Sequence, residues 1–369
     1  MHGVLPRETL LRLALLRQAE GNPRPLQAVL GAFPGVAAAV ARQRFLDAGL
    51  RDWLSPLCVD DAALCRQYAA DIAVLTGEGV SVVAVDELAY PPLLAEINAP
   101  PPMLFCRGDA GLLARPQIAI VGSRNASPAG LAAARAFAAD LAAAGFVITS
   151  GMALGIDAMA HEGAIAAGGA TIAVLGCGVD VVYPRRHAAL ARAITHQGCL
   201  VTEYLPGTPP RPAQFPLRNR IISALSLGVL VVEAAPDSGS LITARFAAEQ
   251  GREVFAIPGS IHSPMSRGCH QLIREGATLV ETSAQLVEAL AHFVLPADRA
   301  SFAVSVPVVR PALPPEERRV LDAIPPDGCA LDQIVLASGM PVARVAGALS
   351  ALEVQGLVHA LAGGLWQPA

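Results

Sequence analysis

The strongest constraint on the fold is a phrase that the sequence repeats between residues 117 and 260. A short apolar run ends in a loop rich in Gly or Ser, and a stretch of helical periodicity follows. The repeats read IAIVGSRNASPAG at 118–130, FVITSGMALGIDAMAH at 146–161, TIAVLGCGVD at 171–180 and VLVVEAAPDSGSLITARFAAEQG at 229–251. Apolar strands that each lead through a tight turn into a helix are typical of a parallel sheet with crossover helices, so we predict a doubly wound α/β fold.

The loops that follow these strands have the composition of phosphate sites. Glycine lets the backbone approach a ligand, the first turn of a helix presents free N–H groups to an anion, and Arg124 supplies a guanidinium fork that can bind a phosphate with two hydrogen bonds. The predicted contacts in these loops are Gly122, Ser123, Arg124, Ser150, Gly151, Ser238, Gly239 and Ser240.

Several polar residues in the same loops also have a structural interpretation. Ser127 precedes a Pro and an alanine-rich run, which predicts the N-cap of a helix. Asp157 suits a helix cap as well as a ligand contact, and Asp237 or Ser238 could be a simple N-cap of the next helix. Glu233, at the end of its strand, could hold a basic segment by an ion pair.

The segment QFPLRNRIISALS at 214–226 has the residues that single-stranded nucleic acid requires. An aromatic ring offers a face on which a base can stack, and guanidinium groups bind the phosphates. Residues 204–232 contain no acid. A structural turn with Arg ion pairs is the competing interpretation of this segment. The predicted contacts here are Arg211, Phe215, Arg218, Asn219 and Arg220.

Composition excludes several classes of protein. All 27 basic residues are Arg, so the chain has neither a P-loop Lys nor a Schiff-base Lys. No loop has the third glycine of the dinucleotide fingerprint, and the seven cysteines form no CxxC. We therefore expect no cofactor and no metal site. Scattered cysteines, and the absence of a signal peptide or a long apolar run, favour a cytoplasmic protein without membrane contact.

The sequence divides into four parts. Residues 1–85 read as a module of short helices, in which VLGAFPGVAAAVA is similar to a helix-hairpin-helix motif, and the small helices as a whole suggest a SAM-like module. Residues 86–295 form the doubly wound domain with a Pro-rich leading segment, and residues 296–315 are rich in Pro and small residues, as in a linker. Residues 316–369 have three amphipathic helices and two strands, the order of a winged helix. Acids outnumber arginines there, which favours a protein-contact or structural role over DNA reading.

Six consecutive blocks carry a family resemblance. VGSRNASPAG, SGMALGIDAMAH, GCGVDVVYP, FPLRNRIISALSLGVLVVEA, SGSLITARFAAEQGREVFAIPG and SRGCHQLIREGA occur in this order. In order and spacing the chain resembles the DprA/Smf DNA-processing family.

That resemblance implies an extended Rossmann-like domain that is not an enzyme. It implies binding of single-stranded DNA, homodimerisation, and loading of the RecA recombinase during natural transformation. The family's DNA pocket would fall on Gly122 to Arg124, on Phe215 and on Arg218 to Arg220, and the loop 238–240 would lie at the same sheet edge. This chain has Leu217 where many relatives carry a basic residue, so its binding would depend more on Arg211.

The alternative from another class is a nucleotide-processing enzyme, such as a nucleoside-monophosphate phosphoribohydrolase. Related folds combine a glycine-rich phosphate loop with an Arg and a carboxylate, and Glu233 or Asp157 would then be the acid or nucleophile. The PGGxGT-type loop of such enzymes is absent from this sequence.

Overall fold

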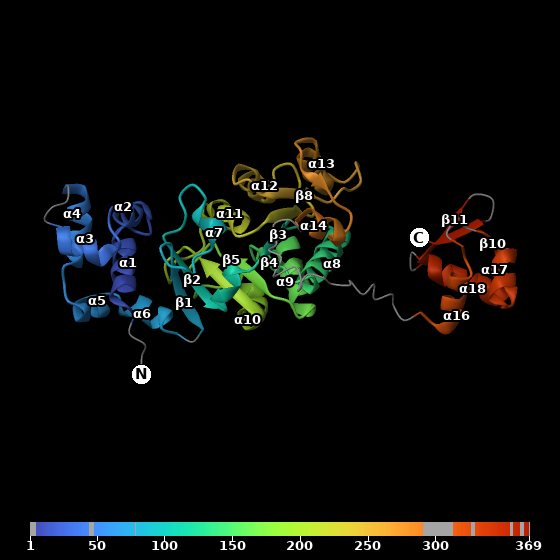
Figure 1. Cartoon of the computed structure of the whole chain (residues 1–369), viewed down its shortest axis with the longest axis horizontal. Coiled ribbons are helices and arrows are strands. Elements are labelled where there is room, and N and C mark those ends of the chain that lie inside the picture. The colour runs from blue at the N-terminus through green and yellow to red at the C-terminus, as the bar shows by residue number, and fades with distance from the viewer. Residues whose placement is uncertain are drawn as a thin grey trace. The chain divides into compact units, whose positions relative to one another are not determined.

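The computed structural model describes residues 5–43, 48–77, 79–290, 313–325, 329–354, 357–361 and 365–368. The chain forms two units, Met1–Val306 and Pro307–Ala369 (Figure 1). The predicted linker at 296–315 lies mostly outside the described residues. No single helix among the described residues is both long and apolar enough to span a membrane.

A nine-stranded sheet is the centre of the first unit, as far as the structure describes it. Its order is β1-β2-β6-β5-β4-β3-β7-β8-β9, and the pairs β1–β2 and β2–β6 are antiparallel while the others are parallel. The predicted doubly wound, mostly parallel sheet is therefore confirmed. The strands are β1 (Val80–Ala84), β2 (Met103–Gly108), β3 (Gln117–Val121), β4 (Val147–Ser150), β5 (Thr171–Val174), β6 (Gly198–Thr202), β7 (Gly228–Val231), β8 (Glu253–Ala256) and β9 (Thr278–Leu279).

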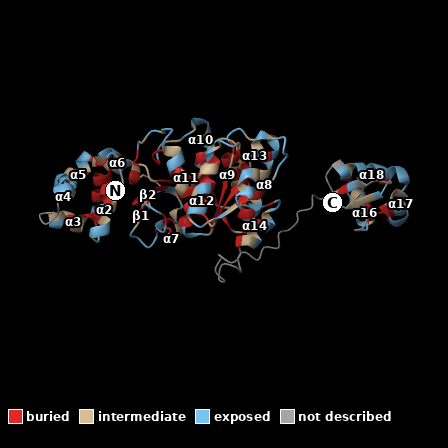
Figure 2. Ribbon diagram, turned by 90° about the horizontal axis from the view of Figure 1, so that it is seen from above, coloured by how far each residue is buried: buried red, intermediate tan, exposed pale blue. Residues whose placement is uncertain are grey.

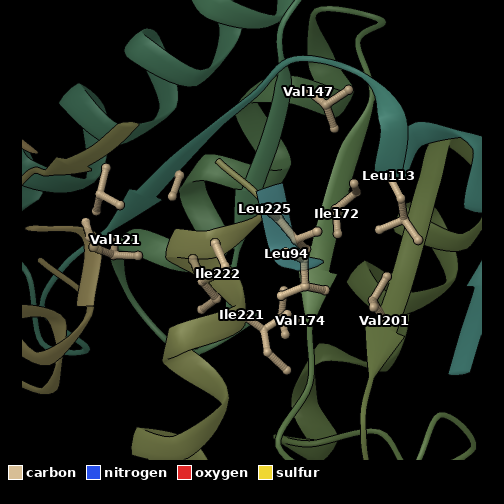
Figure 3. Close-up of a cluster of buried hydrophobic side chains, with 14 of the residues drawn as sticks. Leu94, Leu113, Val121, Val147, Ile172, Val174, Val201, Ile221, Ile222 and Leu225 are labelled. Atoms are coloured by element: carbon tan, nitrogen blue, oxygen red, sulfur yellow. The ribbon is translucent and has the colours of Figure 1, made fainter. Parts of the chain in front are cut away.

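Helices cover both faces of this sheet, and the buried residues are concentrated between the layers (Figure 2). One face packs against α8, α9, α10 and α14, and the other against α7, α11, α12 and α13. In Figure 3, Ile221 and Ile222 of α11 lie among strand residues such as Val121 and Val174. The helices are α7 (Pro92–Ala95), α8 (Pro128–Ala143), α9 (Ile156–Ala166), α10 (Ala188–Gln197), α11 (Gln214–Ala224), α12 (Gly239–Glu249), α13 (Arg267–Arg274) and α14 (Ser283–Leu290).

The strand order reverses at β3. From β3 the chain adds β4, β5 and β6 on one side, and then returns to place β7 on the other side. The loops that follow β3 and β7 therefore diverge to opposite faces and leave a crevice at the carboxyl ends of the two strands. In open α/β sheets this is where ligands bind.

The N-terminal helices pack directly on the sheet. Leu13 of α1 shares a core with Phe105 of β2, and the buried Arg12 donates to Glu8 and Asp86. Strand β1 falls within the predicted module 1–85, although it pairs with β2 of the sheet. The helices are α1 (Arg7–Gln18), α2 (Arg24–Ala32), α3 (Val36–Arg42), α4 (Ala48–Leu54), α5 (Asp61–Gln67) and α6 (Ala69–Leu75).

The hairpin between α2 and α3 is closed by a carboxylate of the chain itself. Glu8 accepts hydrogen bonds from the backbone N–H of Val36 at 2.7 Å and of Ala37 at 2.9 Å. Backbone N–H groups at the start of a helix are also the donors that a phosphate would bind. The arrangement supports a structural role for this hairpin, because Glu8 already occupies the start of α3.

The second unit has the order of elements of a winged helix, as predicted. Its three-stranded sheet has the order β10-β12-β11, and Val320, Ile334 and Leu349 lie in its core. Arg344, the only Arg of the third helix, pairs with Glu316. The elements are α16 (Pro315–Asp322), β10 (Cys329–Ala330), α17 (Leu331–Ser338), α18 (Val342–Val354), β11 (Val358–Leu361) and β12 (Leu365–Pro368).

Candidate functional site

A pocket of about 640 Å³ opens at the crevice between β3 and β7. Its walls are formed by α11, the start of α12 and residues that follow β3, β4, β5 and β7, so the parallel strands deliver distant sequence segments to one edge. The predicted contact residues that line it are Gly122, Ser123, Arg124, Phe215, Arg218, Asn219, Ser238, Gly239 and Ser240.

Arg124 is exposed at the mouth of this pocket. Its guanidinium carbon lies 5.8 Å from the centroid of the Phe215 ring, within range of a cation–π contact. Gly122 is required at the turn, since a Cβ there would lie 2.6 Å from Cγ1 of Ile156 and 2.9 Å from the carbonyl oxygen of Glu233. The turn therefore places the guanidinium of Arg124 beside the ring and in contact with solvent.

Arg218 lies beneath the pocket, and only 4% of it is exposed. It donates to the carbonyl oxygen of Gly151 at 2.8 Å and to that of Val174. Burial lowers the pKa of Arg218 to about 10, so the side chain stays charged at neutral pH. A Cβ at position 151 would overlap the guanidinium. Arg218 thus ties the ends of β4 and β5 together, and much of its hydrogen-bonding capacity is used inside the protein.

Asp157 closes the loop that follows β4. Its carboxylate accepts from the backbone N–H of Gly151 at 3.2 Å and of Ala153 at 3.3 Å. Burial raises the pKa of this carboxyl, and the positive charge of Arg218 opposes that shift. These contacts support the structural interpretation of Asp157, with its side chain capping a loop.

Ser238 is the N-cap of α12, as one of the two sequence interpretations proposed. Its Oγ accepts from the backbone N–H of Ser240 at 3.3 Å and lies 2.7 Å from the Oγ of Ser240. Gly239 between them is exposed. The loop therefore presents two hydroxyls and the start of an 11-residue helix to the pocket.

Glu233 does not have the predicted ion pair with the basic segment. It instead accepts from the backbone N–H of Ser127 at 2.8 Å and from its Oγ at 2.6 Å. Ser127 in turn accepts from the N–H of Gly130, which confirms it as the N-cap of α8. The carboxylate is thus part of the cap of α8.

The remaining predicted residues lie outside the main pocket. Ser150 is buried and donates to the carbonyl of Ile120. Gly151 lines a separate cavity of about 50 Å³. Arg211 is exposed just before the pocket residue Pro212.

The two residues after Arg218 lie differently again. The Nδ2 of Asn219 donates to the carbonyl of Gly239 at 3.3 Å, which joins the first turns of α11 and α12. Arg220 pairs with Glu203 and lines a different cavity. Leu217 is 56% exposed and does not line the main pocket.

Sequence reasoning missed Tyr183, which lines both the main pocket and the small cavity. Its ring centroid is 5.4 Å from that of Phe215, at an interplanar angle of 34°. Arg185 and Arg186 follow and are exposed. An aromatic residue beside two arginines, after the third glycine-rich turn, was the available signal.

We name the four exposed arginines at or next to the pocket the rim arginines. Among the described residues, no carboxylate forms an ion pair with any of them. They give the carboxyl edge of the sheet a cationic margin although the whole chain has a net charge of −4. The rim arginines are Arg124, Arg185, Arg186 and Arg211.

Two family models match most of the chain. The model described as DNA recombination-mediator protein A covers residues 81–291, and that of the DprA winged helix domain covers residues 307–364. Protein Smf of Escherichia coli is 44% identical over 77% of this chain and 76% of its own length. The DNA processing protein DprA of Streptococcus pneumoniae is 48% identical over 64% of this chain and 79% of its own length.

Solved structures agree with these matches. The crystal structure of DprA from Streptococcus pneumoniae superimposes with a TM-score of 0.59 at 36% identity, and covers 77% of this chain and 93% of that one. A structure of DNA processing protein A from Helicobacter pylori gives a TM-score of 0.53 at 30% identity, over 58% and 97% of the two chains. The chain belongs to the DprA/Smf family of DNA-processing proteins.

Proposed function

We propose that this protein binds single-stranded DNA in the pocket at the β3–β7 crevice and acts as a recombination mediator. The observation that carries the proposal is the exposed guanidinium of Arg124, which lies over the Phe215 ring in a pocket that Tyr183 and the hydroxyl-bearing Ser238 and Ser240 also line. Guanidinium groups neutralise phosphates, and rings bind bases whose faces are free. The related protein from Helicobacter pylori is described as having a single-stranded DNA binding mode.

The contacts proposed for this pocket do not read the hydrogen-bonding edges of the bases. Ring faces accept any base, and the hydroxyls of Ser238 and Ser240 suit phosphate oxygens. A duplex keeps its bases stacked on one another, so it cannot offer them to Tyr183 or Phe215. We therefore expect binding that favours single strands and is tolerant of sequence.

Fluorescence anisotropy with a labelled single strand and the matching duplex tests the proposal. We expect the single strand to bind more tightly, and Arg124→Gln to weaken its binding for all sequences alike. The matched control is Arg135→Gln, which removes an equally exposed charge from α8, away from the pocket. Equal affinity for the two forms of DNA, or equal effects of the two variants, would refute the proposal.

We also propose that the protein loads RecA onto incoming strands in the cytoplasm during natural transformation. This rests on family membership. RecA's DNA-dependent ATP hydrolysis, measured on a strand already coated with single-strand-binding protein, tests it. We expect ATP hydrolysis to begin sooner when the wild-type protein is added, and not when Arg124→Gln is added. If the wild type does not accelerate the onset of hydrolysis, the proposal is contradicted.

A homodimer is the oligomeric state that we propose. Among the described residues, strand β9 pairs only with β8. Its Leu279 is 44% exposed, and Ile261 is 75% exposed. An exposed strand edge with apolar side chains favours association with a second copy. Sedimentation velocity should show a dimer that Leu279→Arg converts to a monomer, and a wild-type monomer at micromolar concentration would refute it.

We propose no catalytic activity for the pocket. The two acids that the phosphoribohydrolase alternative would use are committed to the fold, because Asp157 accepts from the backbone of its own loop and Glu233 accepts from Ser127. Release of free base from nucleoside monophosphates would overturn this assignment.

A further inference from the structure

We propose that Tyr183, and not Phe215, is the ring on which an unpaired base stacks. This inference rests on the proposed function and assigns the base-binding residue within it. Phe215 was the aromatic residue that the sequence indicated, since it lies among the arginines of 214–226. The structure places the two rings side by side but leaves them in different surroundings.

The Phe215 ring is already in contact with other parts of the protein. The backbone of Gly176 lies so close to it that a Cβ at that position would be 2.9 Å from Cδ1 of the ring. The guanidinium of Arg124 lies over the ring at 5.8 Å from its centroid. Phe215 is only partly exposed, and Arg124 covers part of the ring on which a base would stack.

The distance between the rings excludes a base clamped between them. Two aromatic contacts, each with carbon atoms about 3.5 Å apart, need ring planes separated by about 7 Å. The centroids of Tyr183 and Phe215 are 5.4 Å apart and the rings are tilted by 34°. The two rings are therefore in direct contact with each other, and Phe215 supports Tyr183.

Tyr183 is the member of this pair that faces solvent. It is 44% exposed and lines both the main pocket and the smaller cavity. Arg185 and Arg186 follow it in the chain, and Arg124 lines the same two cavities as Tyr183. A strand whose base stacks on Tyr183 thus has guanidinium groups nearby for its phosphates.

Stacking strength gives this arrangement a base preference. A purine covers more of the phenol ring than a pyrimidine does, and preferences of this kind arise from stacking and not from hydrogen bonds to base edges. We expect the wild-type protein to bind oligo-dA more tightly than oligo-dT. Tyr183→Ala should reduce that difference.

A double-mutant cycle between the ring and the base tests the inference. Affinities are measured for wild type and Tyr183→Ala, each with a normal single strand and with an abasic strand of the same length. Tyr183→Ala should weaken binding of the normal strand about 5- to 150-fold, the effect of one stacked base, and should matter much less on the abasic strand. Tyr183→Phe should bind within about twofold of wild type.

Two further variants complete the design. Trp53→Ala removes another exposed aromatic side chain, 36% exposed on α4, and should leave binding unchanged. Tyr183→Leu keeps an apolar contact with Phe215 without an aromatic face, and replaces Tyr183→Ala if that variant melts earlier than wild type. Tyr183→Leu should show the same loss of affinity for the normal strand as Tyr183→Ala.

The possible results separate this inference from the proposed function. If the wild-type protein binds no single strand, the proposed function itself fails. If the wild type binds but Tyr183→Ala and Tyr183→Leu bind equally well, or lose as much on the abasic strand, Tyr183 is not the stacking residue. A loss confined to strands that carry bases supports the assignment.

Discussion

Arg218→Gln tests whether the buried arginine beneath the pocket is structural. The guanidinium donates to the carbonyls of Gly151 and Val174, which follow β4 and end β5, and lies near the buried carboxyl of Asp157. Glutamine removes the charge and cannot reach both carbonyls from its shorter side chain. The variant therefore leaves an acceptor unsatisfied and Asp157 without its nearby positive charge.

The expected cost follows from these two losses. Removing one partner of a buried charged arrangement costs about 3–5 kcal/mol, of which an unsatisfied acceptor accounts for about 1–3 kcal/mol. For a domain of 150–250 residues each kcal/mol lowers Tm by about 2–4 °C. Arg218→Gln should therefore melt about 6–20 °C below wild type, and Arg124→Gln, whose side chain is exposed, within about 2 °C.

Thermal melting followed by circular dichroism measures this difference at pH 7, where Arg218, with a pKa of about 10, is charged. Arg218→Lys keeps the charge but has a single donor group, so an intermediate Tm is expected. DNA affinity should be measured well below the lowest Tm. If Arg218→Gln has the same Tm as the wild type yet loses as much DNA affinity as Arg124→Gln, then Arg218 contacts the ligand and its structural assignment is wrong.

Three more outcomes are expected. If the rim arginines neutralise three to four phosphates, the logarithm of affinity for a single strand should fall with log[salt] with a slope of about −2 to −3. Arg124→Gln should reduce the magnitude of that slope by about 0.7. A slope near zero in anisotropy titrations would contradict this. Burial lowers the pKa of His161 from its usual 6.5 to about 3. As the pH falls, His161 is therefore protonated in the unfolded chain before it is protonated in the folded one. The free energy of unfolding decreases as the pH drops below about 6.5, by about 2 kcal/mol at pH 5. An unchanged urea midpoint between pH 7 and pH 5 would refute this. Asp237 is an exposed carboxylate that lines the pocket, where it would repel phosphates. Asp237→Asn should therefore tighten DNA binding about two- to fivefold at low salt and not at 1 M salt. Weaker binding by this variant would instead indicate that Asp237 contacts the ligand.

The loops that meet at this sheet edge could be predicted from the sequence, because the topology of a parallel sheet largely determines them. Each repeat ends a buried strand in a small-residue loop, and the carboxyl ends of parallel strands meet at one edge. Gly122 and Ser238, more than a hundred residues apart, were therefore expected together, and the structure has both in the lining of one pocket. The N-cap at Ser127 followed from purely local chemistry.

The roles of the arginines in α11 could not be read from the sequence. At 3.6 residues per turn, Arg218 and Arg220 point about 200° apart, so only one of them can face the pocket. Both lie next to apolar residues, and no pattern tells which side of the helix faces the crevice. Their partners, the carbonyls of Gly151 and Val174 for one and Glu203 for the other, come from distant segments.

A chain with a net charge of −4 can still attract a polyanion, because three acids near the crevice are engaged in internal contacts, although Asp237 stays exposed in the pocket. Asp157 binds its own loop, Glu233 caps α8, and Glu203 pairs with Arg220. Each of these contacts fixes a loop or helix that forms the crevice, and each also takes a carboxylate away from the rim. These three carboxylates are consequently not available to the rim arginines, and the cationic margin depends on the same hydrogen bonds that shape the pocket. The net charge of the chain is therefore a poor indicator of DNA binding in this fold. The contacts that each carboxylate makes are a better indicator, because they determine the local charge at the pocket.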